Sequence, residues 1–363
     1  MYAVRVPSDA SEKGQAEQRL VTRDLSRYVR QMRYPPLGEV GQARLAESSA
    51  LVCGCGALGS VAANTLVRAG VGGVRIVDRD FVETNNLQRQ ILFDEQDVAQ
   101  QLPKAVAAAA KLRTINSEVA VEPIVADVDA TNIERLCDGM DVIVDGTDNF
   151  ETRFLLNDVS VAKRIPWVYG GCIGAEGQTM TILPGETPCL RCLMEECPPP
   201  GTLPTCDTAG ILGPIVNVIA SIEALEAIKI LSGRRDAVSR RLTVVELWDN
   251  AFRQMNVESL RDQVDCPTCK HGDFPWLSGR AGSRSAVLCG RNAVQLTHHR
   301  ANTSLDALAD QLQGVGEVRR NAFLLRLKVD AYELTVFPDG RAIVGGTSDV
   351  ALAKTLYAKY IGH

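Results

Sequence analysis

Four cysteines in two closely spaced pairs are the residues whose spacing points most directly to a chemical role. The pairs are Cys189-Leu-Arg-Cys192 and Cys266-Pro-Thr-Cys269, and they lie far apart along the chain. Two such CxxC pairs are typical of a tetrahedral zinc site with four thiolate ligands. Four unrelated buried thiols would leave the paired spacing unexplained. The sequence therefore predicts one zinc ion that joins two distant segments.

A glycine-rich turn near residue 55 is the second feature with a chemical meaning. Gly54, Gly56 and Gly59 form a GxGxxG pattern between an expected strand and an expected helix. Glycines at this spacing allow a tight turn and let the backbone approach phosphate at the helix N-terminus. The next expected strand ends at Asp78, where a carboxylate can bind ribose hydroxyls. These residues predict a nucleotide site that fits NAD and ATP equally; a solvated turn is the simpler alternative for Asp78.

Polar residues that suit a triphosphate follow this glycine-rich turn. They are Asn86, Arg89, Gln90, Lys104, Asp148 and Asn149. Amide, guanidinium and ammonium groups near one loop fit a triphosphate better than a pyrophosphate bridge. Asp148 follows an expected strand, and an aspartate at the carboxyl edge of a sheet can hold Mg²⁺. An ordinary surface role is the alternative for each residue alone, but their joint occurrence favours a site for ATP and Mg²⁺.

The elements that would position these residues alternate between strands and helices. Strands are expected at 50–53, 74–77, 119–125, 141–144 and 167–171, and helices at 60–69, 104–115 and 150–163. This alternation is typical of a mostly parallel, doubly wound, Rossmann-like α/β sheet. An antiparallel extension is expected to begin at 179–183, followed by a helix at 213–231 and a strand at 242–247.

The chain is expected to have four parts. They are a flexible tail at 1–24, a zinc-stapled ATP-binding domain at 25–272, a Gly-, Ser- and Arg-rich linker at 273–284, and a small α+β module at 285–363. The last part is long enough to form a separate domain, and its role is open. Within it we expect helices at 306–312 and 349–360 and a pair of strands at 323–329 and 332–337.

Composition narrows the function classes. The 363 residues are 45% hydrophobic and 23% charged, so the chain can bury a large core. A net charge of -5 and the absence of a Lys/Arg block disfavour a nucleic-acid partner. The longest apolar segment, 211–231, carries charges at helical spacing, which favours a buried helix over a membrane span. The first 20 residues contain no apolar signal segment, so we expect a cytoplasmic protein in which eleven cysteines serve metal or thiol chemistry.

Taken in order, these motifs resemble those of the ubiquitin-activating-type adenylyltransferases of sulfur-carrier proteins, the ThiF/MoeB/HesA family. Members of this family serve the molybdopterin and thiamine pathways, among others. The matching elements are Arg27-Tyr-Val-Arg30-Gln31, the glycine turn, Asp78-Arg-Asp80, Asn86-Leu-Gln-Arg89-Gln90, Pro103-Lys104, Asp145-Gly-Thr-Asp148-Asn149, both cysteine pairs and Thr205-Cys206. They cover residues 25–272, about two thirds of the chain.

The resemblance implies an activity and a set of residue roles. A ubiquitin-like sulfur carrier ending in Gly-Gly would be adenylated by ATP, and a cysteine desulfurase or a rhodanese would then supply sulfur. The implied ATP ligands are the glycine turn, Asp78, Asp80, Asn86, Arg89 and Lys104, with Mg²⁺ held by Asp148 and structural zinc held by the cysteine pairs. Arg30 would reach from the second subunit of a homodimer into the site.

The remaining cysteines divide into two groups. Cys206 lies on an expected crossover loop, where a thiol could form a thioester with the carrier or relay persulfide sulfur from a donor to it. Cys197 is the alternative thiol on the same loop. The others, Cys53, Cys55, Cys137 and Cys172, lie in apolar surroundings and are expected to fill the core.

Two other functions remain possible from the sequence. The glycine turn and Asp78 also fit an NAD-dependent oxidoreductase, but all four histidines lie outside the expected sheet region. A non-catalytic scaffold with the same fold could bind a carrier without activating it. Arg30, Arg89, Lys104 and Asp148 together favour an active enzyme over such a scaffold.

Overall fold

The larger of two sheets carries the expected nucleotide-binding segments. The computed structural model describes residues 25–198, 209–281, 285–288, 292–296 and 304–361. The larger sheet has the strand order β3-β2-β1-β4-β5-β6-β7-β8, parallel from β3 to β5 and antiparallel from β5 to β8. Its strands are β1 (Ser49–Cys53), β2 (Gly73–Asp78), β3 (Ala120–Val125), β4 (Val142–Asp145), β5 (Trp167–Ile173), β6 (Glu176–Ile182), β7 (Arg241–Glu246) and β8 (Ala251–Asn256). The doubly wound sheet with an antiparallel extension is confirmed, although the sequence analysis did not anticipate β8.

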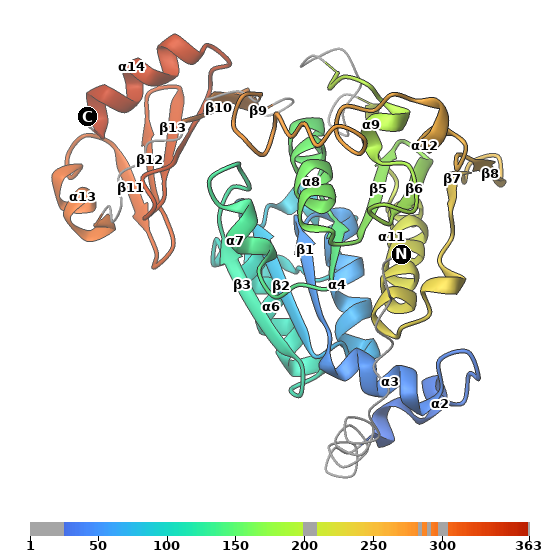
Figure 1. Ribbon diagram of the computed structural model, residues 1–363. Helices are drawn as coiled ribbons and strands as arrows, with labels where there is room; N and C mark the ends of the chain where they lie inside the picture. Colours follow the sequence, from blue (N-terminus) through green and yellow to red (C-terminus); the bar gives the residue numbers. More distant parts are fainter. Residues whose placement is uncertain (1–24, 199–208, 282–284, 289–291, 297–303, 362–363) are drawn as a thin grey trace.

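Helices cover both faces of this sheet (Figure 1). Because successive strand residues point to opposite faces, Val52 of β1 joins one apolar core and Leu51 joins the other. Helices α4 and α6 and the end of α11 contribute to the first core, and α7 and α8 contribute to the second. The helices of this part of the chain are η1 (Ser26–Tyr28), α2 (Val29–Met32), α3 (Gly38–Glu47), α4 (Ala57–Ala69), η2 (Thr84–Asn86), α5 (Glu95–Ala99), α6 (Lys104–Ile115), α7 (Ile133–Cys137), α8 (Phe150–Lys163), α9 (Leu190–Leu193), α11 (Gly213–Leu231), η3 (Arg235–Ala237) and α12 (Leu260–Gln263).

The long apolar segment forms helix α11, which packs inside the molecule. It contacts α4, β5 and β6. Its acidic residues are buried: Glu226 accepts a hydrogen bond from Ser239 N at 2.8 Å, and burial raises the pKa of Glu223 well above its usual range. Among the described residues, no helix is long and apolar enough to cross a membrane.

The C-terminal module forms a second, antiparallel sheet. Its strand order is β11-β12-β13-β14-β10-β9, and Figure 1 shows it beside the β3 edge of the larger sheet. Its elements are β9 (Ser285–Leu288), β10 (Ala293–Leu296), α13 (Leu305–Gln311), β11 (Glu317–Arg320), β12 (Leu325–Val329), β13 (Tyr332–Val336), β14 (Ala342–Gly345) and α14 (Val350–Tyr360). The expected hairpin and both expected helices are present and share one apolar core. The four-residue strands β9, β10, β11 and β14 were not anticipated, because so short a segment shows little periodicity.

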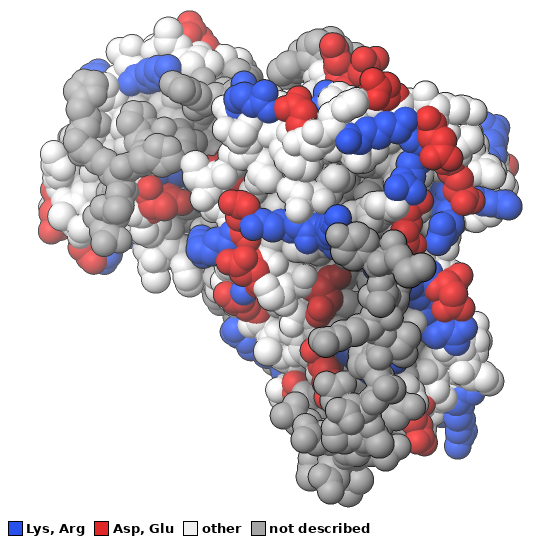
Figure 2. Space-filling view, viewed as in Figure 1, with Lys and Arg blue, Asp and Glu red and all other residues white. Residues whose placement is uncertain are grey.

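Charges of both signs are mixed on the face of the molecule shown in Figure 2. Lys and Arg side chains lie among Asp and Glu side chains there, with no continuous basic area. That face therefore lacks the single-sign field that attracts a phosphate backbone.

Candidate active site

The glycine turn lies where the strand order of the larger sheet reverses. Strand β1 lies between β2 and β4, and the turn leaves its carboxyl end. Ligands of doubly wound sheets bind at such a switch point. Gly54 has a φ of +87°, and a Cβ atom on Gly59 would lie only 1.9 Å from the carbonyl oxygen of Gly54. Because no side chain caps the start of α4, its first N–H groups can bind phosphate.

Asp78, Asp80 and Lys104 come together beside this turn. The Asp78 carboxylate accepts hydrogen bonds from Cys55 N at 2.6 Å and from Asp80 N at 2.7 Å, which fixes its orientation. Burial raises the pKa of Asp78, and the Lys104 ammonium opposes that rise. Lys104 is only 3% exposed, and its Nζ lies 3.3 Å from an oxygen of Asp80. The structure thus places a buried cation and two carboxylates beside the glycine turn.

The polar loop around η2 also approaches the glycine turn. Gln90 is 3% exposed, and its Nε2 would lie 3.9 Å from a Cβ atom on Gly56. Arg89 is partly buried and donates to the carbonyl oxygen of Asn85 at 2.8 Å. Asn86 is buried, and its amide is engaged by the neighbouring residues in a capping box. Arg89 and Gln90 are therefore the members of this loop best placed to meet a ligand, while Asn86 holds the loop in shape.

The segment after β4 carries the remaining predicted site residues, Asp148 and Asn149. Asp148 is exposed, whereas Asn149 accepts a hydrogen bond from Thr152 N at 2.8 Å and caps α8. Below them, the fully buried Asp145 lies 3.5 Å from Arg153 Nε. Burial raises the pKa of Asp145, and the Arg153 guanidinium opposes that rise. This ion pair was not predicted from the sequence, and it supports the loop that presents Asp148.

Arg30 does not belong to this group in its own chain. It is exposed in α2, and α3 leads from α2 to the amino end of β1, opposite the glycine turn. Figure 1 shows α2 and α3 together at that end of the sheet. Gln31 anchors α2 by donating to Ala69 O at 3.0 Å. In its own chain, Arg30 therefore lies at the opposite end of β1 from the glycine turn.

The four paired cysteines converge into one cluster. Their sulfur atoms lie within 4.8 Å of one another, with Sγ···Sγ distances of 3.4 to 3.8 Å for three of the pairs. Four sulfurs bound tetrahedrally to zinc at 2.3 Å would lie about 3.8 Å apart. The donor set therefore fits zinc. The cluster links α9 to the segment after α12, as the sequence predicted.

The structure separates the remaining cysteines by environment. Cys53, Cys55 and Cys137 are buried in the sheet cores, and Cys172 packs partly buried beside α11, so their expected role as core residues is confirmed. Burial, followed by the charge of Glu151, raises the pKa of Cys197 to about 11, which disfavours its thiolate. Cys206 lies outside the described residues.

Known proteins are similar to this chain over the nucleotide-binding domain and, for one relative, over most of the whole length. The model of the ThiF family matches residues 28–268. The sulfur carrier protein ThiS adenylyltransferase of Bacillus subtilis is 46% identical over 338 residues, which cover 93% of this chain and 99% of that protein. The SAMP-activating enzyme E1 of Haloferax volcanii is 42% identical over 248 residues, covering 68% of this chain and 90% of its own length. The crystal structure of E. coli MccB with ATP superposes with a TM-score of 0.57 at 23% identity, covering 67% of this chain and 73% of that one, which shows the shared fold.

Proposed function

The chain belongs to the ThiF family, and we propose that it adenylates the C-terminal carboxylate of a ubiquitin-like sulfur carrier protein. The observation that carries this proposal is the 46% identity to a ThiS adenylyltransferase over 338 residues. The match covers 93% of this chain, so most of the C-terminal module is shared as well. We therefore favour a ThiS-type carrier of the thiamine pathway over the molybdopterin-pathway carrier that the motifs also allow.

The proposed reaction is the attack of the carrier's terminal carboxylate on the α-phosphate of ATP. A bond forms between a carboxylate oxygen and the α-phosphorus, and the bond to the bridging oxygen of pyrophosphate breaks. Pyrophosphate leaves with the electron pair, and an acyl-adenylate remains. This reaction needs positioning and charge neutralisation more than covalent help from the protein. The later replacement of AMP by sulfur requires a donor such as a cysteine desulfurase or a rhodanese.

Each residue of the site has a role that its position supports. The N–H groups at the start of α4 would hold phosphate, and Asp78 would accept hydrogen bonds from the ribose hydroxyls. Arg89 and Lys104 would neutralise the phosphates, aided by Arg30 from the second subunit of a homodimer. Mg²⁺ would spread the negative charge of the phosphates, and the exposed Asp148 offers the carboxylate oxygens that this ion prefers.

Zinc has a structural role in this proposal. The cysteine cluster lies among apolar residues of the α8 core and keeps no open position for substrate. It joins the segment after α12 to α9, which precedes Cys206 in the chain. We propose that zinc fixes the position of α9, and that Cys206 is the thiol available for a covalent step.

The test is ATP–pyrophosphate exchange with small carriers that end in Gly-Gly, added one at a time. Exchange with a ThiS-type carrier is expected, and the same carrier without its last glycine is the matched control. Exchange should disappear in Asp148→Ala. A zinc-loaded protein that binds the carrier but shows no exchange would be a scaffold, and NADH binding without ATP binding would instead support an oxidoreductase.

A further inference from the structure

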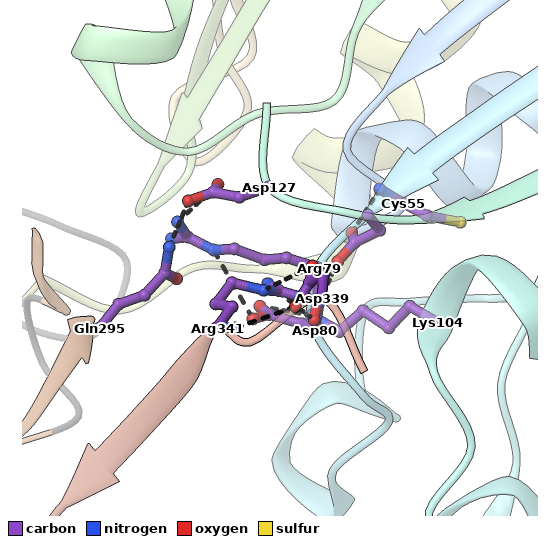
Figure 3. A network of polar contacts seen from close by, with 9 residues as sticks. Cys55, Arg79, Asp80, Lys104, Asp127, Gln295, Asp339 and Arg341 are labelled. Carbon is purple, nitrogen blue, oxygen red and sulfur yellow. Dashed lines mark hydrogen bonds and ion pairs between the residues drawn. The ribbon is translucent and has the colours of Figure 1, made fainter. Parts of the chain in front are cut away.

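The C-terminal module contacts the nucleotide-binding domain at two loops next to the proposed ATP site. These loops leave the carboxyl ends of β2 and β3. Arg341 Nη1 lies 3.5 Å from the carbonyl oxygen of Arg79, the residue after Asp78, and Gln295 donates to Asp127, which follows β3 (Figure 3). Because Asp78 is the expected ribose ligand, the base of a bound nucleotide would lie beyond it, toward these two loops. The module therefore borders the base end of the site.

Arg341 is a buried side chain of the module at this contact. It is 2% exposed, and its Nε and Nη2 have no hydrogen-bond partner among the described residues. Its guanidinium stacks on Phe337 at 4.0 Å, and its Nε lies 3.6 Å from a carboxylate oxygen of Asp339. The turn that carries it is closed by a hydrogen bond of 2.9 Å from Phe337 N to its carbonyl oxygen. A guanidinium is not deprotonated in proteins, so a buried positive charge is held rigidly against the loop of residues 79–81.

Several other charged side chains lie near Arg341 at this contact. The carboxylates of Asp78, Asp80, Asp127 and Asp339 face the cations Arg79, Lys104 and Arg341. Arg341 supplies one of the positive charges in this group, so its removal would make the local net charge more negative by one unit. ATP is itself an anion, so an extra negative charge in a half-buried site would oppose its binding.

We propose that the C-terminal module is a built-in part of the ATP site, in which Arg341 positions the loop of residues 79–81 and balances its carboxylates. Docking of the module and binding of ATP then reinforce each other, because a coupling between two sites acts equally in both directions. This inference rests on the proposed function insofar as that function places ATP at this site. Arg341 acts through Arg79 and Asp80 and is a positioning residue.

The experiment measures ATP binding by calorimetry with ATP and Mg²⁺ alone, and then exchange kinetics with the carrier. Arg341→Ala is expected to weaken ATP binding by about tenfold, within the usual range of coupling between sites. At saturating ATP, the KM for the carrier and kcat should change by less than about twofold, because Arg341 is proposed to affect ATP binding and not carrier binding or the chemical step. Arg341→Lys should recover part of the affinity, because it restores the positive charge without the guanidinium geometry. Asp339→Asn should raise the affinity, because it removes a negative charge next to Arg341.

Arg319→Ala is the matched control. Arg319 lies on the same small sheet, is 64% exposed and pairs only with Glu317 among the described residues. This change should leave ATP binding unaltered. As a readout of docking, ATP should slow amide hydrogen exchange of residues 337–345 in the wild-type chain and not in Arg341→Ala.

Two results would overturn the inference. One is a folded Arg341→Ala variant that binds ATP as tightly as the wild type. The other is an equal loss in ATP affinity, carrier KM and kcat, with no recovery by Lys, which would indicate general structural damage. Failure of the proposed function is distinguishable, since it would appear as missing carrier-dependent exchange in the wild-type chain while ATP binding by calorimetry still reports on Arg341.

Discussion

Cys189→Ser should remove zinc and cost a large part of the stability of this protein. Cys189 is 1% exposed and, through the cluster, is linked to Cys266, 77 residues later. Constraining a loop of that length in the unfolded chain corresponds to about 4.5 kcal/mol at 25 °C in the loop-entropy description of cross-links. Since domains are commonly stable by only about 5–15 kcal/mol, we expect the free energy of unfolding to fall by about 4 kcal/mol.

The assay combines metal content with urea unfolding. The wild type should contain about one zinc per chain, and the variant almost none, because three thiolates bind zinc less tightly than four. Cys137→Ser is the matched control: Cys137 is also buried, at 2% exposure, but lies outside the cluster. It should keep its zinc and lose about 1–2 kcal/mol, the cost of burying a hydroxyl group. A Cys189→Ser protein that retains zinc, or that is no less stable than Cys137→Ser, would refute the reasoning.

Three further predictions test the site and its surroundings. Arg30→Ala and Asp148→Ala should each abolish exchange. Mixing the two variants should restore roughly a quarter of wild-type activity, because half of the dimers are mixed and each mixed dimer has one intact site. No recovery on mixing would count against Arg30 acting across a dimer. Gly59→Ala should weaken ATP binding by more than about tenfold, since its Cβ atom would lie 1.9 Å from a carbonyl oxygen and the turn must shift; calorimetry that finds unchanged affinity would contradict this. Burial raises the pKa of Asp158 from 3.8 to about 6, so the folded state binds the proton more tightly and the free energy of unfolding should fall by at most about 3 kcal/mol between pH 4 and pH 6. Asp158→Asn should lack that fall. If the prediction is wrong, the free energies of unfolding of the wild type and the variant, measured with urea at several pH values, would change in parallel.

Local sequence patterns were enough for most of the larger sheet. Helices α6 and α8 begin and end where the sequence analysis expected them, because Pro103 precedes one and Asn149 caps the other. The glycine turn could be recognised because only glycine fits positions such as Gly54 and Gly59. The cysteine cluster followed from spacing alone, since two CxxC pairs have few structural explanations besides a shared metal.

Roles in packing and capping were harder to assign. Asn149 was predicted only as a residue near the nucleotide, and the structure shows that it also caps α8; the position of an Asn directly before a helical segment was the available signal. Arg153 was missed because a charged residue inside a helix normally faces solvent. Its burial against Asp145 depends on how α8 packs over the sheet, which no local pattern records.

The sequence by itself determined most strands and helices of the larger sheet, the glycine turn and the four paired thiols, because these depend on residues close together or on a spacing with one chemical meaning. Only the tertiary structure decided that Arg341 lies against Arg79, 262 residues away, and that Gln295 reaches Asp127, 168 residues away. Such contacts depend on how two separately formed sheets pack, and the free energy of that packing is distributed over many side chains. A polar residue on a short strand carries no local sign of the partner that this packing will give it.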